Sequence, residues 1–412
     1  MRMLAQPSAE TMASFEKVWQ TVEQRHWDPA FLAKLPGGRS WREVHDEYLQ
    51  LIKQAPSDME GRALIARMLS LLGQSHYAVL TGEPADDLTP VQGGVGATGI
   101  DPMFTEGCML VRAVAANSPA ARAGIRPGWE IVSIDGFDVR QATARIRERP
   151  GQLKQPSSLL RMLVLGRLSG PPGVAARITF AGAHNQLIRR SIVRERPSGN
   201  LSRFGFLPPT LVEFTASRPR PDIGYVRFNL FLDPPGLMAK FEEAIRSCLR
   251  CRGLVIDLRG NPGGLAILAA SMTGFLIDTP DTYLGTLYQR EVQLKLIVNP
   301  RLEVFSGPVA ILVDGSSVST SEIMAGGLQD LKRARIFGER TAGAALPSMV
   351  ERLPNGDLFQ YAVANYVSAG GQTLEGRGVT PDVVVPTPRA ALLRGQDPVL
   401  EAALHWLYES RP

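Results

Sequence analysis

The chain has 412 residues, of which 44% are hydrophobic and 21% are charged. This composition is typical of a globular protein with two or three domains, and it excludes the disordered and fibrous classes. The formal charge of +5 is spread along the chain without a run of like charges. We therefore expect neither nucleic acid nor an anionic membrane as a partner.

The apolar stretches are all shorter than the run of about 18 residues that suggests a membrane span, so we expect no membrane span. The first residues, MRMLAQPSAETMASFEKVW, lack the apolar segment of a secretory signal. Either the protein stays inside the cell or a signal was removed.

The three cysteines, Cys108, Cys248 and Cys251, allow at most one disulfide bridge. Cys248 and Cys251 form a CxxC pattern without a second pair or a histidine partner. That pattern gives little support to a zinc site or a thioredoxin-like redox centre. We predict two partly buried thiols at a helix end.

Three parts with different patterns follow one another along the chain. Residues 1–82 carry apolar side chains at helical spacing, for example Phe15 and Val18, and predict a helical domain. Residues 91–197 contain short β-branched segments broken by glycines. Residues 205–412 alternate apolar strands, such as YVRFNLF, GLVIDL and PVAILVD, with helical stretches, which predicts an α/β layer architecture within an α+β protein overall.

The segment SPAARAGIRPGWEIVSIDG, residues 118–136, resembles a PDZ domain. PDZ domains add the C-terminus of a peptide as a strand to a sheet edge, and the N–H groups of a glycine-rich loop receive its carboxylate. The resemblance implies a loop at residues 93–96 followed by a strand at residues 97–100. The substrate-binding residues that it implies are Gly94, Val95, Gly96 and Gly99.

Two departures from the PDZ pattern leave an alternative open. Trp129 stands where an aspartate usually follows Pro-Gly, and residues 149–175 resemble an insertion. The alternative is a PDZ-like module that binds no peptide and only packs against the rest of the protein.

A serine-rich turn follows the apolar strand PVAILVDG, and a helical stretch begins directly after it. Ser319, on this strand-to-helix turn, is expected to be exposed near the positive end of the helix, as a nucleophile would be. Small neighbours at Ser317 and Ser321 are expected to let a substrate backbone approach. The alternative is an ordinary serine cap of a helix.

An upstream strand, GLVIDLRGNPGG, ends in a glycine-rich turn whose backbone N–H groups can converge on an anion. Gly263 and Gly264 are therefore candidates for one half of an oxyanion hole, and the Thr320 N–H is the candidate for the other half. The alternatives are a plain turn or a weak phosphate loop. The turn lacks the GK[ST] ending of a P-loop, so we expect no nucleotide.

These stretches, together with GYVRFNLF, FGERTAG and LEGRGVTPDVVVP, resemble in this order the core of the C-terminal processing, or tail-specific, serine peptidases. The resemblance covers about the last half of the chain and implies a spiral core of ββα units like that of the Clp protease and crotonase folds. By the family's SxSxSE motif the nucleophile is Ser319. The family usually pairs this serine with a lysine, but that position holds Ala344 here, and the only lysine beyond Ser319 is Lys332, in an expected surface turn.

The tricorn-like branch of the family implies a different base. Its members use a Ser-His pair before the PDZ domain and a glutamate, and the counterparts here are Ser75, His76 and Glu375. In this reading His76 takes the Ser319 proton, and Ser75 and Glu375 orient the imidazole. The alternatives are that His76 is a surface residue after a helix and that Glu375 is an exposed loop acid.

Two classes of function remain from the sequence. The first is a serine peptidase that acts on proteins or peptides and needs neither metal nor cofactor. The second is a catalytically silent binding protein of the same fold, as in the modules of the interphotoreceptor retinoid-binding protein. The resemblance points to the periplasm or the cell surface, whereas the start of the chain shows no signal segment.

Overall fold

The computed structural model describes residues 7–80, 94–148, 156–197, 199–203, 205–206 and 209–410. The expected junction between residues 82 and 91 lies outside the described residues, as does part of the expected insertion at residues 149–175. Within the described residues no helix is both long and apolar enough to cross a membrane.

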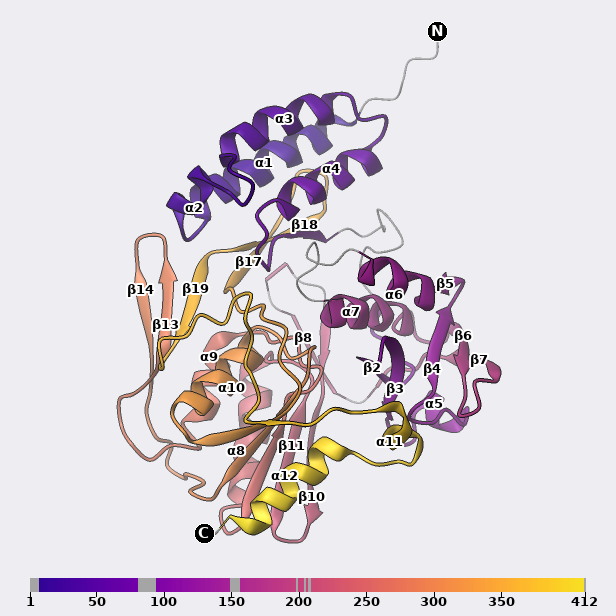
Figure 1. The fold of residues 1–412 in the computed structure, drawn as a ribbon, viewed down its shortest axis with the longest axis vertical. Helices are drawn as coiled ribbons and strands as arrows, with labels where there is room; N and C mark the ends of the chain where they lie inside the picture. Colours follow the sequence, from indigo (N-terminus) through magenta and orange to yellow (C-terminus); the bar gives the residue numbers. More distant parts are fainter. Residues whose placement is uncertain are drawn as a thin grey trace.

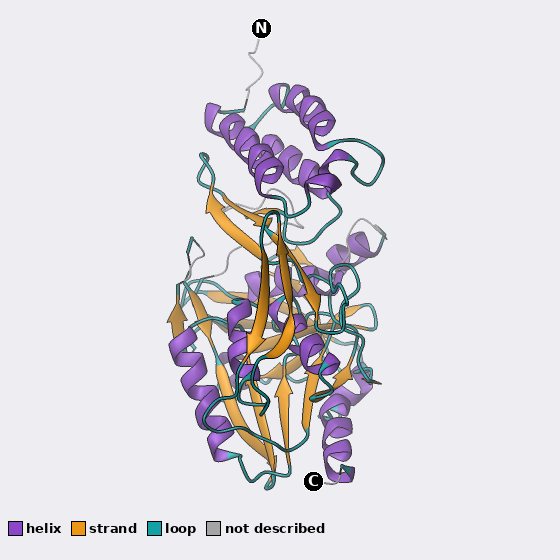
Figure 2. Ribbon diagram, turned by 90° about the vertical axis from the view of Figure 1, so that its left-hand side faces the viewer, coloured by secondary structure: helices purple, strands orange, loops and turns teal. Residues whose placement is uncertain are grey.

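A six-stranded sheet forms the centre of the C-terminal half (Figures 1 and 2). Its strands, in spatial order, are β10 (Phe214–Arg220), β11 (Ile223–Phe228), β12 (Gly253–Asp257), β15 (Val309–Val313), β16 (Ala334–Gly338) and β20 (Val383–Val384). All neighbours from β11 to β20 run parallel, and β10 is an antiparallel edge strand. Every residue of β12 and β15 is buried, as their uninterrupted apolar sequences require of a sheet covered on both faces.

Helices cover both faces of this central sheet. The helices are α8 (Pro234–Ser247), α9 (Ala266–Thr273) and α10 (Thr320–Asp330) on one face and α12 (Pro398–Glu409) on the other. Leu254 and Ile256 of β12 pack in the cluster of α8, α9 and α10, whereas Val255 between them packs in the cluster of α12. This alternation follows from the two-residue period of a strand. The predicted mixed α/β architecture is confirmed.

Two three-stranded sheets extend from this centre. They are β14 (Gln293–Val298), β13 (Thr282–Gln289) and β19 (Ala364–Ser368), and β1 (Ala78–Leu80), β18 (Leu358–Ala362) and β17 (Ser348–Arg352), each in spatial order. Strand β1 comes from the N-terminal part of the chain, and its Ala78 pairs with Gln360 of β18. This pairing brings the chain around residue 76 next to the C-terminal half.

The N-terminal helices pack onto the hairpin of β17 and β18 (Figure 1). They are α1 (Ala9–Arg25), α2 (Pro29–Ala33), α3 (Trp41–Lys53) and α4 (Asp58–Ser70). Their core includes Phe15 and Trp41 and continues into Leu353 and Phe359 of the hairpin. Arg62 of α4 donates to the buried Asp357 at 2.7 Å. The helices and the hairpin therefore share one hydrophobic core.

The middle of the chain forms a sheet of its own, in magenta at the right of Figure 1. Its strands are β2 (Ile100–Thr105), β3 (Cys108–Val114), β4 (Glu130–Ile134), β5 (Phe137–Asp138), β6 (Ala175–Ala181) and β7 (Leu187–Val193). The accompanying helices are α5 (Pro119–Arg122), α6 (Val139–Arg147) and α7 (Pro156–Leu168). The remaining elements of the described residues are β8 (Asn200–Ser202), β9 (Thr210–Val212) and α11 (Arg389–Leu393). The first strand was expected at residues 97–100 but begins at Ile100.

Ion pairs join the middle sheet to the central sheet. Asp101 of β2 accepts hydrogen bonds from Arg161 of α7 at 2.8 Å and from Arg227 of β11 at 3.0 Å. Arg227 also donates to Asp257 of β12, which is fully buried, at 3.2 Å. Burial would raise the pKa of both carboxyls, but Arg112 and Arg227 beside Asp101, and Arg259 and Arg227 beside Asp257, hold each pKa well below the ordinary range.

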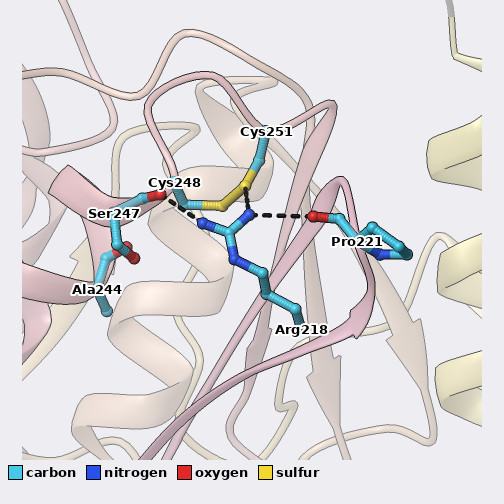
Figure 3. Close-up of a disulfide and its surroundings, with 6 residues drawn as sticks. All are labelled: Arg218, Pro221, Ala244, Ser247, Cys248 and Cys251. Carbon is cyan, nitrogen blue, oxygen red and sulfur yellow. Dashed lines mark hydrogen bonds between the residues drawn. A yellow bond between two sulfur atoms is a disulfide. The ribbon is translucent and has the colours of Figure 1, made fainter.

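The prediction of free thiols in the CxxC pattern is wrong, because Cys248 and Cys251 form a disulfide (Figure 3). Cys248 ends α8, and the turn after the helix brings the two Cα atoms to 4.9 Å. The guanidinium of Arg218 donates to Cys251 Sγ at 2.9 Å and to the carbonyl oxygen of Pro221 at 3.2 Å. Arg218 thus joins the disulfide, which follows α8, to the turn between β10 and β11.

Candidate active site

Ser319 lies on the turn between β15 and α10 and is partly exposed. Its φ of 56° and ψ of −116° are unfavourable for a residue with a side chain, a strain that often accompanies functional turns. The Ser319 N–H lies 3.0 Å from a carboxylate oxygen of Glu322 and 2.9 Å from the carbonyl oxygen of Ala344. The turn is therefore held by partners on α10 and on residues 341–344.

The neighbouring serines lie inside the protein. Ser317 and Ser321 are fully buried, and their hydroxyls donate to the carbonyl oxygens of Leu258 at 2.8 Å and Asn261 at 2.9 Å. The expectation that these small residues leave room for an approaching substrate backbone is not supported, because neither side chain reaches the surface. They join the serine turn to the glycine-rich turn instead.

Glu322 is a residue whose role the sequence reasoning missed. It is fully buried three residues after Ser319, and besides the Ser319 N–H it accepts from Thr341 Oγ1 at 2.6 Å, Gly343 N at 2.7 Å and Ala344 N at 2.9 Å. Burial raises its pKa to about 7, although these four donors favour the charged form. The sequence did carry a sign of this role. Glu322 is the third residue of the helix, a position from which a glutamate side chain often accepts the N–H of the residue before the helix.

The structure gives no substitute for the lysine that the family usually carries. Ala344, at that position, is 1% exposed and bonded to Glu322 through its N–H. Lys332 is exposed in the turn after α10. If Ser319 is the nucleophile, neither of these two positions supplies its base.

The glycine-rich turn packs directly against the serine turn. A Cβ on Gly263 would lie 2.8 Å from Ser319 Cβ and from the Thr320 nitrogen, so only glycine fits there. The Gly263 N–H already donates to Asn261 Oδ1 at 2.9 Å. The expectation that Gly263 offers a free oxyanion donor is therefore not supported. In the described part of the chain, the N–H groups of Gly264 and Thr320 have no acceptor.

Ser75, His76 and Glu375 come together although Glu375 lies 300 residues away from Ser75. The Ser75 N–H and hydroxyl donate to the two carboxylate oxygens of Glu375 at 2.8 and 2.7 Å, and Ser75 Oγ lies 2.7 Å from His76 Nδ1. Since the single hydroxyl proton goes to the carboxylate, Nδ1 must carry the proton that it shares with Ser75. His76 Nε2 is then an unprotonated acceptor.

The His76 backbone and environment are both unusual. Its φ of 61° lies in the left-handed region, which costs a non-glycine residue about 1–3 kcal/mol. The side chain is partly exposed, and desolvation by the surrounding protein lowers its pKa to about 4. The imidazole is therefore neutral at pH 7 and can accept a proton.

A chain of hydrogen bonds joins the two halves of the site. Ser319 is bonded to Ala344, and the N–H of the next residue, Ala345, donates to Glu375 at 3.1 Å. Glu375 in turn holds Ser75 and, through it, His76. Across the described residues, Ser319 and His76 share no direct hydrogen bond.

The expected peptide-binding loop is partly occupied by its own chain. The Gly96 N–H donates to the carbonyl oxygen of Gly170 at 2.8 Å, and the carbonyl oxygen of Gly99 accepts from Ala115 at 2.9 Å. The N–H groups of Gly94 and Val95 have no acceptor within the parts that the structure describes. Gly93, which was also expected in the loop, lies outside the described residues.

Comparisons with known proteins agree on one family. Residues 222–385 match the model of peptidase family S41. The chain is 26% identical over 372 residues to the carboxy-terminal-processing protease of Bartonella bacilliformis, a match that covers 88% of this chain and 77% of that protein.

Two solved structures share the fold. The photosystem II D1 C-terminal processing protease has a TM-score of 0.58 at 24% identity, covering 95% of this chain and 99% of that one. The tricorn protease has a TM-score of 0.51 at 17% identity, covering 97% of this chain and 36% of that one. The structural matches show the fold, and the family model and the sequence relatives confirm the predicted resemblance: the chain is a homologue of the C-terminal processing proteases of serine peptidase family S41.

Proposed function

We propose that the chain hydrolyses peptide bonds with Ser319 as nucleophile and His76 as general base. The observation that carries the proposal is the bonded series Glu375, Ser75 and His76, which leaves an unprotonated Nε2 on a neutral imidazole. A positioned base of this kind typically contributes a 10²–10⁴-fold rate increase. With His76 as the base, the reaction does not need a lysine at the position of Ala344.

In the first step His76 Nε2 takes the Ser319 hydroxyl proton while Oγ attacks the carbonyl carbon of the scissile bond. The developing oxyanion is bound by the N–H groups of Gly264 and Thr320, at the start of α10. His76 next gives its proton to the leaving amine, and a water molecule hydrolyses the acyl-enzyme by the same route. Because Ser319 and His76 share no hydrogen bond, the step requires the two side chains to approach when substrate binds, as in many unliganded enzymes.

Ser75 and Glu375 act as positioning residues in this scheme. The carboxylate accepts both Ser75 donors and the Ala345 N–H, so it fixes the hydroxyl that in turn fixes the histidine tautomer. When His76 becomes protonated, the carboxylate also stabilises the positive charge through the Ser75 hydroxyl.

The division of the chain into a helical domain (1–82), a PDZ-like domain (91–197) and a peptidase core (205–412) of the Clp protease and crotonase type belongs to the same proposal. Separate hydrophobic clusters in the middle sheet and around the central sheet support the boundary between the PDZ-like domain and the core, whereas the N-terminal helices share their core with the hairpin of β17 and β18. A substrate C-terminus would bind the PDZ-like domain at Gly94 and Val95, whose N–H groups have no acceptor among the described residues. At Gly96 it would have to displace the bond to Gly170.

The test is labelling with a fluorophosphonate, which forms a covalent bond with an activated serine and releases fluoride. We expect wild type to be labelled, Ser319→Ala to stay unlabelled, and His76→Ala to react 10²–10⁴-fold more slowly. His405→Ala, which changes a histidine on the outer surface of α12, is the matched control and should react as wild type does. Equal rates for His76→Ala and wild type would refute the proposed base, and an unlabelled wild type would favour the silent binding protein.

A further inference from the structure

His26 is a fully buried histidine at the end of α1, and the proposed chemistry does not use it. Its ring is stacked on Phe31, with 5.2 Å between centroids and 6° between planes, and on Tyr77, with 5.9 Å and 8°. Nδ1 accepts the Asp28 N–H at 2.9 Å, so the ring proton is on Nε2 and is donated to Gln74 Oε1 at 3.0 Å. Burial lowers the pKa of His26 despite the opposing hydrogen bonds, which keeps this tautomer neutral.

The two residues that His26 contacts across the fold, Gln74 and Tyr77, directly flank Ser75 and His76 in the sequence. Gln74 is held by the His26 Nε2–H, and Tyr77 is held by the ring stack and by its hydroxyl bond to Ala362 of β18 at 3.2 Å. Both ends of the Ser-His segment are thus anchored, and His26 contributes to both anchors.

This anchoring matters because the segment between the anchors is strained. The left-handed φ of His76 persists only where surrounding structure holds the backbone in place. If the anchor at Gln74 were lost, the backbone could relax, and Ser75 could no longer hold both Glu375 and His76 Nδ1. The tautomer that leaves Nε2 unprotonated would then no longer be enforced.

We propose that His26 is a positioning residue for the His76 base, acting through its hydrogen bond to Gln74 and its stack on Tyr77. The inference rests on the proposed function of His76. It concerns the position and tautomer of His76, which can be measured whether or not His76 acts as the base.

Two amide variants, each of which can replace one ring nitrogen, separate the contacts of the ring. In His26→Gln the terminal amide nitrogen can take the place of Nε2–H and donate to Gln74 Oε1. In His26→Asn the shorter side chain can replace only Nδ1, with its amide oxygen accepting the Asp28 backbone N–H. Both variants lose the same aromatic stack, so they form a matched pair. Gln74→Ala removes the acceptor from the other side, at a partly exposed position where folding is less at risk.

The first readout is the rate of fluorophosphonate labelling, separated into probe binding and maximal rate. For His26→Asn and Gln74→Ala we expect the maximal rate to fall by about tenfold to hundredfold with probe affinity unchanged, since small displacements of a catalytic group cost this much. For His26→Gln we expect a rate nearer to wild type. Circular dichroism at the assay temperature checks that each variant is folded.

The second readout is the ¹⁵N spectrum of the imidazoles, assigned by single substitution of the five histidines. Wild-type His76 should show a protonated Nδ1, and His26→Asn and Gln74→Ala should show mixed tautomers at His76. Wild-type rates together with an unchanged His76 spectrum in folded His26→Asn and Gln74→Ala would overturn the inference. Wild-type labelling of His76→Ala would refute the proposed base instead, and the spectra would still decide the role of His26.

Discussion

Replacing Gly263 with alanine tests whether the glycine-rich turn sets the position of the nucleophile. Gly263 has a φ of +95°, so any L-residue there incurs a backbone cost of about 1–2 kcal/mol. The added Cβ would also lie 2.8 Å from Ser319 Cβ, from the Thr320 nitrogen and from the Val318 carbonyl oxygen. None of these atoms can rotate away, so the two turns must separate by roughly half an ångström to regain van der Waals contact.

The control is Gly136→Ala, because Gly136 has a similar φ of +89° and open space around its Cβ position. We expect Gly136→Ala to lose about 1–2 kcal/mol of unfolding free energy in urea titrations, and Gly263→Ala to lose about 1–3 kcal/mol more, because its added Cβ forces two packed turns apart. Only Gly263→Ala should also lose labelling, by about tenfold, because a shift of 1 Å costs about a hundredfold. Equal labelling of Gly263→Ala and Gly136→Ala would refute the reasoning.

Three further predictions concern pH and the buried charges. Because desolvation lowers the pKa of His76 from 6.5 to about 4, labelling should stay constant down to about pH 5 and fall near pH 4; a midpoint at or above 6.5 would contradict this assignment. The unfolded chain binds the extra proton between pH 6.5 and 4, so wild type should lose stability relative to His76→Asn as pH falls through this window. Asp257→Asn should lower the unfolding free energy by about 3–5 kcal/mol in guanidinium titrations, because it leaves the buried Arg259 with Asp397 as its remaining carboxylate partner. Glu303→Gln, which removes an exposed ion pair with Arg246, is the control, and a loss as large as that of Asp257→Asn would argue against burial as the cause.

The sequence by itself determined the elements whose signals are local. The apolar runs of β12 and β15 predict buried strands, since a strand whose two faces are both covered carries apolar residues at successive positions. In the structure every residue of both strands is buried. The strand-to-helix transition at Ser319 follows from the end of one such run and the start of a helical pattern. The missing lysine at Ala344 is likewise visible in the sequence.

The family resemblance implied that Ser75, His76 and Glu375 act together, but only the tertiary structure decided how these groups are bonded and which other groups remain free. The contact between Ser75 and Glu375 spans 300 residues and depends on the pairing of β1 with β18, which no local pattern encodes. The burial of Ser317 and Ser321, the donation of the Gly263 N–H to Asn261 and the disulfide of Cys248 depend equally on the packing of neighbouring turns. Local sequence selects backbone conformation, whereas hydrogen-bond partners and solvent exposure are set by segments that the fold brings together from far along the chain.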